Sequence, residues 1–225
     1  MNQAIVDSLQ GVTLVGGGPV TGAALARALV LAPRVVAADS GADRLLRQGV
    51  EPEAVIGDMD SLSPAARARL AGRVHEVAEQ DTTDFDKALR LVAAPFVLAL
   101  GFAGGRVDHG LAVLNALTRH PDRRCFVIGP QDVVFLCPPE LRLELPRGTR
   151  LSLFPMGAVR GTSRGLRWPL EGIDFAPDGL IGTSNRVTGP VHLTMEAPKM
   201  LVMLPVRYLA QALGGFGLQA AVRGG

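Results

Sequence analysis

Short apolar runs alternate with helical patterns through the first ~130 residues. Six runs predict strands, at 12–17, 34–39, 54–58, 73–78, 96–102 and 124–129. The segments between them predict helices, at 21–32, 42–48, 64–71, 83–94 and 108–119. Because the strands are apolar throughout, they suit a parallel sheet that is covered on both faces. The repeated strand–helix order predicts a doubly wound α/β domain with right-handed crossovers.

The pattern changes after about residue 137. Apolar and polar positions alternate with period two over 141–157, and turn-rich segments then lead to an apolar stretch at 191–206. This is typical of a small antiparallel β-sandwich. The CPPE stretch at 137–140 predicts the linker. We therefore expect two domains: a doubly wound, mostly parallel α/β domain over 1–137, followed by an antiparallel β-sandwich domain over 138–225.

Composition narrows the class of protein. A hydrophobic share of 48%, a charged share of 20% and a net charge of +2 indicate an ordinary globular protein, without a nucleic-acid-binding or membrane surface. The chain has no apolar run of membrane-spanning length and no signal-peptide pattern at its start. Cys125 and Cys137 lack metal-ligand spacing. We expect both to be reduced in a cytoplasmic protein.

Acidic residues gather where the predicted strands end. They are Asp39, Asp58, Asp60, Asp84 and Asp108. In open α/β sheets, ligands bind at the carboxyl edge of the strands. Carboxylates accompanied by Lys87 and Arg106 are suited to holding a divalent metal together with phosphates.

The GDMDS segment at 57–61 supplies two of these carboxylates. In an extended segment Asp58 and Asp60 point the same way, so they repel each other unless a cation lies between them. A bound Mg²⁺ resolves that repulsion. The alternative is a turn in which Asp60 caps a helix that begins near Ser63 and Pro64.

The DTTDFDKAL segment predicts the start of a helix capped by a threonine. Its buried stripe would consist of Phe85, Leu89 and Val92. Asp84 and Lys87 share another face, where an ordinary surface ion pair is one interpretation. In the functional interpretation, Asp84 faces a metal while Lys87 and the Thr83 hydroxyl face phosphate oxygens.

The GGRVDH segment follows the strand at 96–102. Its glycines allow close approach of a ligand, and Arg106 offers a planar fork that suits phosphate. Asp108 and His109 open the next helix, and Asp108 alone is also explained as a helix cap. The predicted apolar stripe of this helix consists of Leu111, Leu114 and Leu117.

A glycine-rich turn at 14–22, followed by Asp39, is close to a dinucleotide-binding fingerprint. It departs from that fingerprint in the last spacing and carries Pro19. An NAD-type oxidoreductase is therefore an alternative, but it leaves the other acidic segments without a role. In the second domain, Trp168, Ser184 and Asn185 stand out, although core packing or a turn explains them equally well.

Taken together, these segments resemble the thiamine pyrophosphokinase family. The matching stretches, in chain order, are VVAADSGADRLL, VIGDMDSL, QDTTDFDKAL, GGRVDHGLAVLNAL, GLRWPL and TSN. The resemblance extends in order over nearly the whole chain. The resemblance implies transfer of the diphosphate of ATP to the hydroxyethyl oxygen of thiamine, which gives thiamine diphosphate and AMP. It also implies an ATP- and metal-binding α/β domain, a β-sandwich that contributes to the thiamine site, and a homodimer with its active sites at the subunit interface.

The resemblance assigns roles by motif. Catalytic roles fall to Asp58, Asp60, Asp84, Lys87, Arg106 and Asp108, with Asp58, Asp60 and Asp84 as Mg²⁺ ligands and Asp58 or Asp108 as general base. Binding roles fall to Asp39, Thr83, His109, Ser184 and Asn185. Some family members stack a Trp of the penultimate strand on the substrate, whereas this chain has PKMLVML there. A metal-dependent hydrolase on the same cluster and a non-catalytic thiamine sensor remain as alternatives.

Overall fold

The computed structural model describes residues 4–218 and comprises two compact units. The first unit runs to Gly129, and the second begins at Pro130. The change of pattern near residue 137 lies inside the second unit, because the apolar run before it forms the first strand of that unit, β9 (Asp132–Leu136). Among the described residues, no helix is long and apolar enough to cross a membrane.

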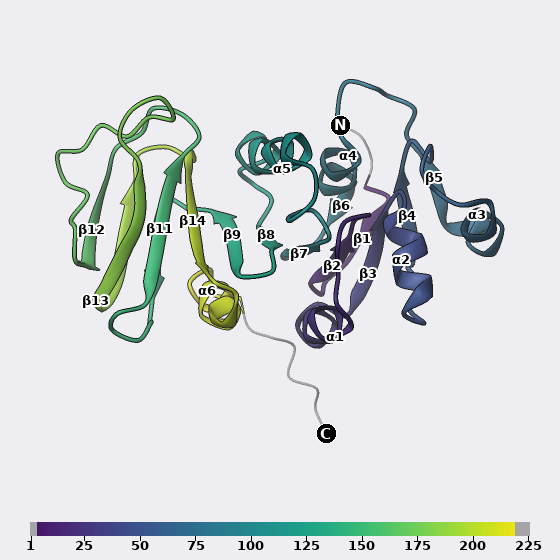
Figure 1. Ribbon diagram of the computed structural model, residues 1–225, viewed down its shortest axis with the longest axis horizontal. Helices are drawn as coiled ribbons and strands as arrows, with labels where there is room; N and C mark the ends of the chain where they lie inside the picture. The colour runs from purple at the N-terminus through teal and green to yellow at the C-terminus, as the bar shows by residue number, and fades with distance from the viewer. Residues whose placement is uncertain (1–3, 219–225) are drawn as a thin grey trace. The chain divides into compact units, whose positions relative to one another are not determined.

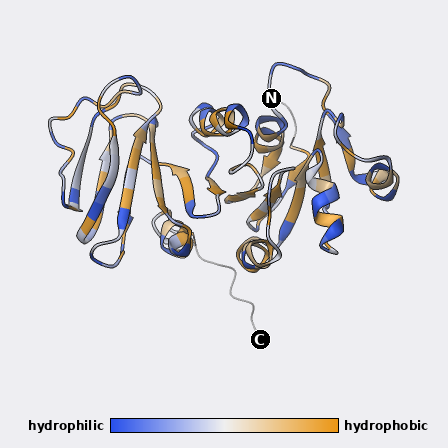
Figure 2. Cartoon of the chain, viewed as in Figure 1, coloured by the Kyte–Doolittle hydropathy of each residue, from blue (hydrophilic) through white to orange (hydrophobic). Residues whose placement is uncertain are grey.

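The first unit contains a parallel sheet with strand order β5-β4-β3-β2-β7-β8 (Figure 1). The strands are β2 (Val12–Val15), β3 (Arg34–Ala38), β4 (Ala54–Gly57), β5 (Val74–Glu76), β7 (Val97–Leu100) and β8 (Cys125–Ile128). Leu14 pairs with Val36 on one side and with Ala99 on the other. The central strands are almost uniformly hydrophobic (Figure 2), so the doubly wound parallel sheet predicted from the sequence is confirmed.

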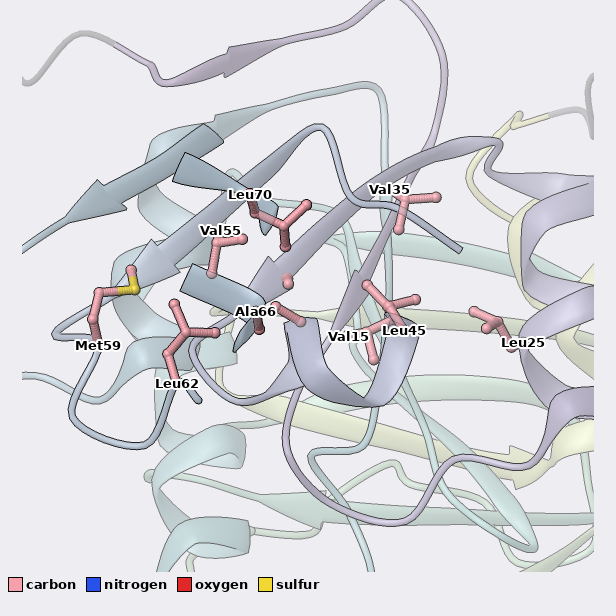
Figure 3. Close-up of a cluster of buried hydrophobic side chains, with 11 residues drawn as sticks. Val15, Leu25, Val35, Leu45, Val55, Met59, Leu62, Ala66 and Leu70 are labelled. Carbon is pink, nitrogen blue, oxygen red and sulfur yellow. The ribbon is translucent and has the colours of Figure 1, made fainter. Parts of the chain in front are cut away.

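Helices cover both faces of this sheet. They are α1 (Gly22–Leu31), α2 (Gly41–Arg47), α3 (Pro64–Arg69), α4 (Asp84–Leu91) and α5 (Val107–Arg119), with a short 3-10 turn, η1, at Ala71–Arg73. On one face, Leu25, Leu45 and Ala66 of α1, α2 and α3 pack against Val15 and Val55 of the strands (Figure 3). Leucine and isoleucine side chains of the same strands alternate to the opposite face, and α4 contacts β3 and β4.

One predicted helix is shorter than its sequence pattern. The pattern extends to residue 94, but α4 ends at Leu91 and the chain continues as β6 (Val92–Ala93). This short strand pairs in parallel with β1 (Val6–Asp7). A β-branched residue at position 92 and a proline at 95 both disfavour continuation of the helix.

The second unit is built from antiparallel strands. Besides β9, they are β10 (Glu140–Leu143), β11 (Arg150–Pro155), β12 (Gly161–Leu166), β13 (Gly182–Met195) and β14 (Met200–Pro205). The first half of β13 pairs with β11, which continues to β14 and β9, while its second half pairs with β10 and β12. The long strand thus joins two sheets, as expected for the predicted antiparallel β-sandwich. A 3-10 turn, η2 (Val206–Tyr208), and a short helix, α6 (Leu209–Gly214), follow.

Candidate active site

A polar cleft of the first unit lies at the carboxyl edge of its parallel sheet. The chain places β3, β4 and β5 on one side of β2 and then β7 and β8 on the other, so the topology switches between β2 and β7. Ligands bind at such switch points in open α/β sheets. The cleft has a volume of about 550 Å³. Its lining includes Gly16–Gly18, Asp39, Ser40, Asp58, Asp60, Ser61, Thr82–Phe85, Gly101, Phe102, Arg106, His109 and Val113.

Three carboxylates meet in this cleft. One oxygen from each of Asp39, Asp58 and Asp60 lies within 4.8 Å of the others, close enough for the three to hold one metal ion. Asp39 is 6% exposed, has a positive φ of 44°, and its Oδ1 is buried with no hydrogen-bond partner. Burial, together with repulsion from Asp84, Asp60 and Asp58, raises the pKa of Asp39. An unpartnered buried carboxylate beside two others fits a divalent cation such as Mg²⁺.

The GDMDS turn directs its two carboxylates to the cleft by burying the residue between them. Met59, at a φ of 64°, packs into the core with 6% exposure. The Asp60 N–H donates to Asp58 Oδ1 at 3.3 Å, and Ser61 Oγ donates to Asp60 Oδ1 at 2.9 Å. Ser63, and not Asp60, caps α3, since Ser63 Oγ accepts from the Ala66 N–H at 3.1 Å. The capping alternative for Asp60 is therefore wrong.

Asp84 and Lys87 lie differently from the sequence expectation of an exposed pair. Lys87 is 1% exposed, and its Nζ donates to Asp58 Oδ2 at 3.3 Å and to Asp84 Oδ1 at 3.2 Å. Asp84 Oδ1 also accepts from the Asp58 N–H at 3.2 Å. Burial lowers the pKa of Lys87, but the two carboxylates outweigh it and leave that pKa above its ordinary value. The surface ion pair is wrong because Lys87 lies underneath the cluster.

Thr83 and Asp86 complete the first turn of α4. Thr83 Oγ1 caps the helix by accepting from the Asp86 N–H at 3.3 Å, and the residue also lines the cleft. Asp86 is a site-adjacent residue that the sequence reasoning missed. It is 3% exposed and accepts from Arg119 Nη1 at 2.9 Å, with His120 Nε2 at 3.0 Å, which ties α4 to the end of α5. The acidic residues at 84 and 86, on either side of a buried Phe, were the available signal.

Arg106 and Asp108 form an exposed pair at the start of α5. Arg106 Nε donates to Asp108 Oδ1 at 3.1 Å, and Nη2 donates to Oδ2 at 2.5 Å. The Arg106 side chain and the His109 N–H lower the pKa of Asp108 to about 2. Arg106 and His109 line the cleft, whereas Asp108 is not among its lining residues. Arg106 occupies the position before the helix, so Asp108 is not the helix cap that one interpretation proposed.

The buried face of α5 also differs from the predicted stripe. Leu111 is 61% exposed and Leu114 is half-buried, whereas Val113, Ala116 and Leu117 form the buried side. The helix therefore turns Val113 towards the cleft.

The glycines after β2 allow this turn to pack closely against the segment that follows β7. The Gly16 N–H donates to Leu100 O at 2.8 Å and the Gly18 N–H to Gly101 O at 2.9 Å, so two of its donors are already engaged. A Cβ on Gly16 would lie 2.5 Å from the Phe102 ring. Phe102 packs against Phe85, with ring centroids 4.7 Å apart, and both line the cleft. These contacts argue against the dinucleotide alternative and reveal an aromatic wall that the sequence reasoning missed.

Ser184 and Asn185 lie on β13 of the second unit. The Asn185 side chain is 4% exposed, donates from Nδ2 to Trp168 O at 2.7 Å, and accepts at Oδ1 from the Trp168 N–H at 3.2 Å. Ser184 has a φ of 62°, and its N–H donates to Ser152 Oγ at 3.0 Å. The amide of Asn185 is thus engaged in holding Trp168, whose side chain is half exposed.

Comparison with known proteins identifies the family. Residues 25–128 match the thiamin pyrophosphokinase catalytic domain, and residues 140–200 match the thiamin pyrophosphokinase vitamin B1 binding domain. The chain is 30% identical over 187 residues to thiamine pyrophosphokinase 1 of Oryza sativa subsp. japonica, a match that covers 68% of this chain and 71% of that protein. The chain belongs to the thiamine pyrophosphokinase family.

Another relative and a solved structure agree with this family assignment. The thiamine pyrophosphokinase of Bacillus subtilis is 28% identical over 182 residues, which cover 75% of this chain and 85% of that protein. The crystal structure of yeast thiamin pyrophosphokinase superposes with a TM-score of 0.73 at 19% identity, covering 91% of this chain and 89% of that one. At that identity the structural likeness shows the shared fold alone.

Proposed function

We propose that this thiamine pyrophosphokinase family member transfers the β,γ-diphosphate of ATP to the hydroxyethyl oxygen of thiamine, releasing AMP. The observation that carries the proposal is the unpartnered, buried Asp39 carboxylate beside Asp58 and Asp60 in the cleft at the topological switch point. Diphosphoryl transfer depends on positioning and charge neutralisation, which a carboxylate-held metal in such a cleft serves. No comparison supports the hydrolase alternative.

Asp39, Asp58 and Asp60 would hold Mg²⁺, and when bound the ion would neutralise charge on the phosphate oxygens. The ligand set predicted from the sequence contains Asp84 instead of Asp39. The geometry favours Asp39, because one of its oxygens lies within 4.8 Å of ligand oxygens of Asp58 and Asp60 and its buried Oδ1 has no other partner. Asp84 Oδ1, in contrast, accepts from Lys87 and from the Asp58 N–H. Asp84 would then fix the orientation of Asp58 within the site.

Arg106, His109 and the Thr83 hydroxyl line the cleft and would contact the phosphates of ATP. Asp108 would align the guanidinium of Arg106 through their paired hydrogen bonds. With a pKa of about 2, Asp108 is a poor proton acceptor. Of the two base candidates, Asp58 is favoured by its position, because it lines the cleft and Asp108 does not.

The second unit would contribute the thiamine site, with Ser184 as a direct contact and Asn185 acting by holding Trp168 in place. The match of residues 140–200 to a vitamin B1 binding domain supports the assignment of the thiamine site to the second unit. We further propose a homodimer, as the family resemblance implies; Val107 and Leu111 expose apolar side chains one turn apart on α5. Two buried, unpaired cysteines suit a reducing, cytoplasmic location.

Nucleotide product analysis tests the proposed function. The protein is incubated with ATP, Mg²⁺ and thiamine, and each component is omitted in turn. We expect AMP to form only in the complete mixture. Release of ADP, or of free phosphate without thiamine, would reject diphosphoryl transfer. Free phosphate would favour the metal-dependent hydrolase as the function of this cluster.

A further inference from the structure

Lys87 lies underneath the carboxylate cluster and not in the cleft. Its side chain is 1% exposed, and it is absent from the residues that line the cleft. Its Nζ contacts Asp58 Oδ2 at 3.3 Å and Asp84 Oδ1 at 3.2 Å. A buried ammonium is costly unless it is paired, and here two carboxylates pair with it.

The four carboxylates, of Asp39, Asp58, Asp60 and Asp84, form two overlapping groups that differ in their contact with Lys87. Asp58 and Asp84 contact the ammonium, and they form the lysine side. On the other side, Asp39 Oδ1 is buried without a partner, while Asp60 Oδ1 accepts from Ser61 Oγ. Asp58 belongs to both sides, because it also lies within 4.8 Å of Asp39 and Asp60 through the ligand oxygens.

We propose that Lys87 is a built-in counter-ion that occupies the Asp58–Asp84 side of the cluster and confines a divalent cation to the Asp39–Asp58–Asp60 side. The inference rests on the proposed function in that this cluster is the metal-binding active site. Lys87 is then a positioning residue that sets where one metal ion binds and how tightly. Direct contact with phosphate would instead require its Nζ to leave both carboxylates and enter the cleft.

Electrostatics gives the direction of the effect. A fixed positive charge opposes binding of a second cation at the two carboxylates that it contacts. The ammonium of Lys87 also weakens binding of the first metal ion, because both the ammonium and that ion contact Asp58. A neutral side chain of similar length at position 87 should raise the affinity of the cluster for a divalent ion by on the order of tenfold or more, or create a second binding position.

Mn²⁺ binding without nucleotide tests this proposal, with electron paramagnetic resonance counting the bound ions on the full chain. Wild type is compared with Lys87→Met and with Lys199→Met, which removes the chain's other lysine at an exposed position of the second unit. We expect one tightly bound Mn²⁺ in wild type and in Lys199→Met. Lys87→Met should bind a second ion or bind the first at least tenfold more tightly. Unchanged or weaker binding by folded Lys87→Met, or two or no ions on wild type, would overturn the proposal.

Because Lys87→Met could fail to fold, a second measurement uses wild type alone. With two lysines in the chain, carbon-13 labelling at lysine Cε gives two signals, which the Lys199→Met variant assigns. We expect Mg²⁺ without ATP to shift the Lys87 signal and to leave Lys199 unchanged. No response of Lys87 to Mg²⁺, or a response to ATP only, would contradict the counter-ion role. Neither measurement involves thiamine or turnover, so the outcome is independent of the AMP assay.

Discussion

The role of Asp39 as a candidate metal ligand became visible only in the three-dimensional structure. Sequence reasoning gave it a binding role, outside the predicted Mg²⁺ ligands, because it follows a buried strand within a family motif. Its position beside Asp58 depends on the register of β3 and β4, in which Ala38 pairs with Ile56, and on its own positive φ. Neither feature is readable from a local pattern, since both depend on tertiary pairing. The motif identified the residue, and the fold supplies its role as a proposed metal ligand.

Replacing Asp39 tests which carboxylates hold the metal. Asp39→Asn should weaken Mn²⁺ binding about tenfold or more and lower turnover by roughly 10²-fold, because a charged ligand is lost. Asp84→Asn should weaken Mn²⁺ binding less. Asp122→Asn, at an exposed surface position, serves as the matched control. Calorimetric titration of the folded variants measures the affinities, and the reverse order for Asp39 and Asp84 would restore the ligand set predicted from the sequence.

Asn185 illustrates a buried polar side chain with a structural task. Asn185→Ala leaves the Trp168 N–H and C=O without their partner, so we expect a loss of about 1–3 kcal/mol in the free energy of unfolding. The intrinsic fluorescence of Trp168, the only tryptophan, should change as its backbone loosens. Asn115→Ala, at an exposed position of α5, is the control. A raised KM for thiamine with unchanged stability and fluorescence would instead show that Asn185 contacts the substrate directly.

At the scale of elements, the strands and helices of the first unit were predictable because each strand is a short, uniformly apolar run bounded by turn residues. Thr83 and Ser63 are helix caps of the expected chemistry. The pattern failed where tertiary contacts decide. The pairing of β6 with β1 ends α4 at Leu91, and the packing of α5 buries Val113 and exposes Leu111. The sequence did not indicate that Lys87 is buried, because lysine is rarely buried unless it is paired and one of its partners here comes from a tertiary contact.

Gly57, the last residue of β4, tests how closely this strand must approach Asp39 and Asp84. A Cβ on Gly57 would lie 3.0 Å from Asp84 Oδ1 and 3.1 Å from Asp39 Cβ. Gly57→Ala should therefore displace these carboxylates and lower turnover by about tenfold or more while the protein remains folded. Gly72→Ala meets nothing within 4 Å and is the matched control. Equal turnover in the two variants would show that the cluster tolerates rearrangement.

At the scale of the whole molecule, sequence motifs were sufficient to predict the family and the two-part architecture. The family is confirmed by the matches to both thiamin pyrophosphokinase domains. Motifs could not show which carboxylates converge. Asp39 follows β3, Asp58 follows β4 and Asp84 begins α4, and only the parallel sheet brings these positions to one edge. The roles of Ser184 and Asn185 in thiamine binding and the homodimer stay predictions.

Diphosphoryl transfer is tested most directly by following the phosphates of ATP into the product. ATP labelled separately at the β and the γ phosphorus is incubated with wild type, Mg²⁺ and thiamine, and the thiamine product is isolated. We expect both labels to enter the product in equal amounts, with one AMP released for each thiamine diphosphate formed. Transfer of the γ label alone, or recovery of either label as free phosphate or pyrophosphate without a thiamine product, would contradict diphosphoryl transfer by this cluster.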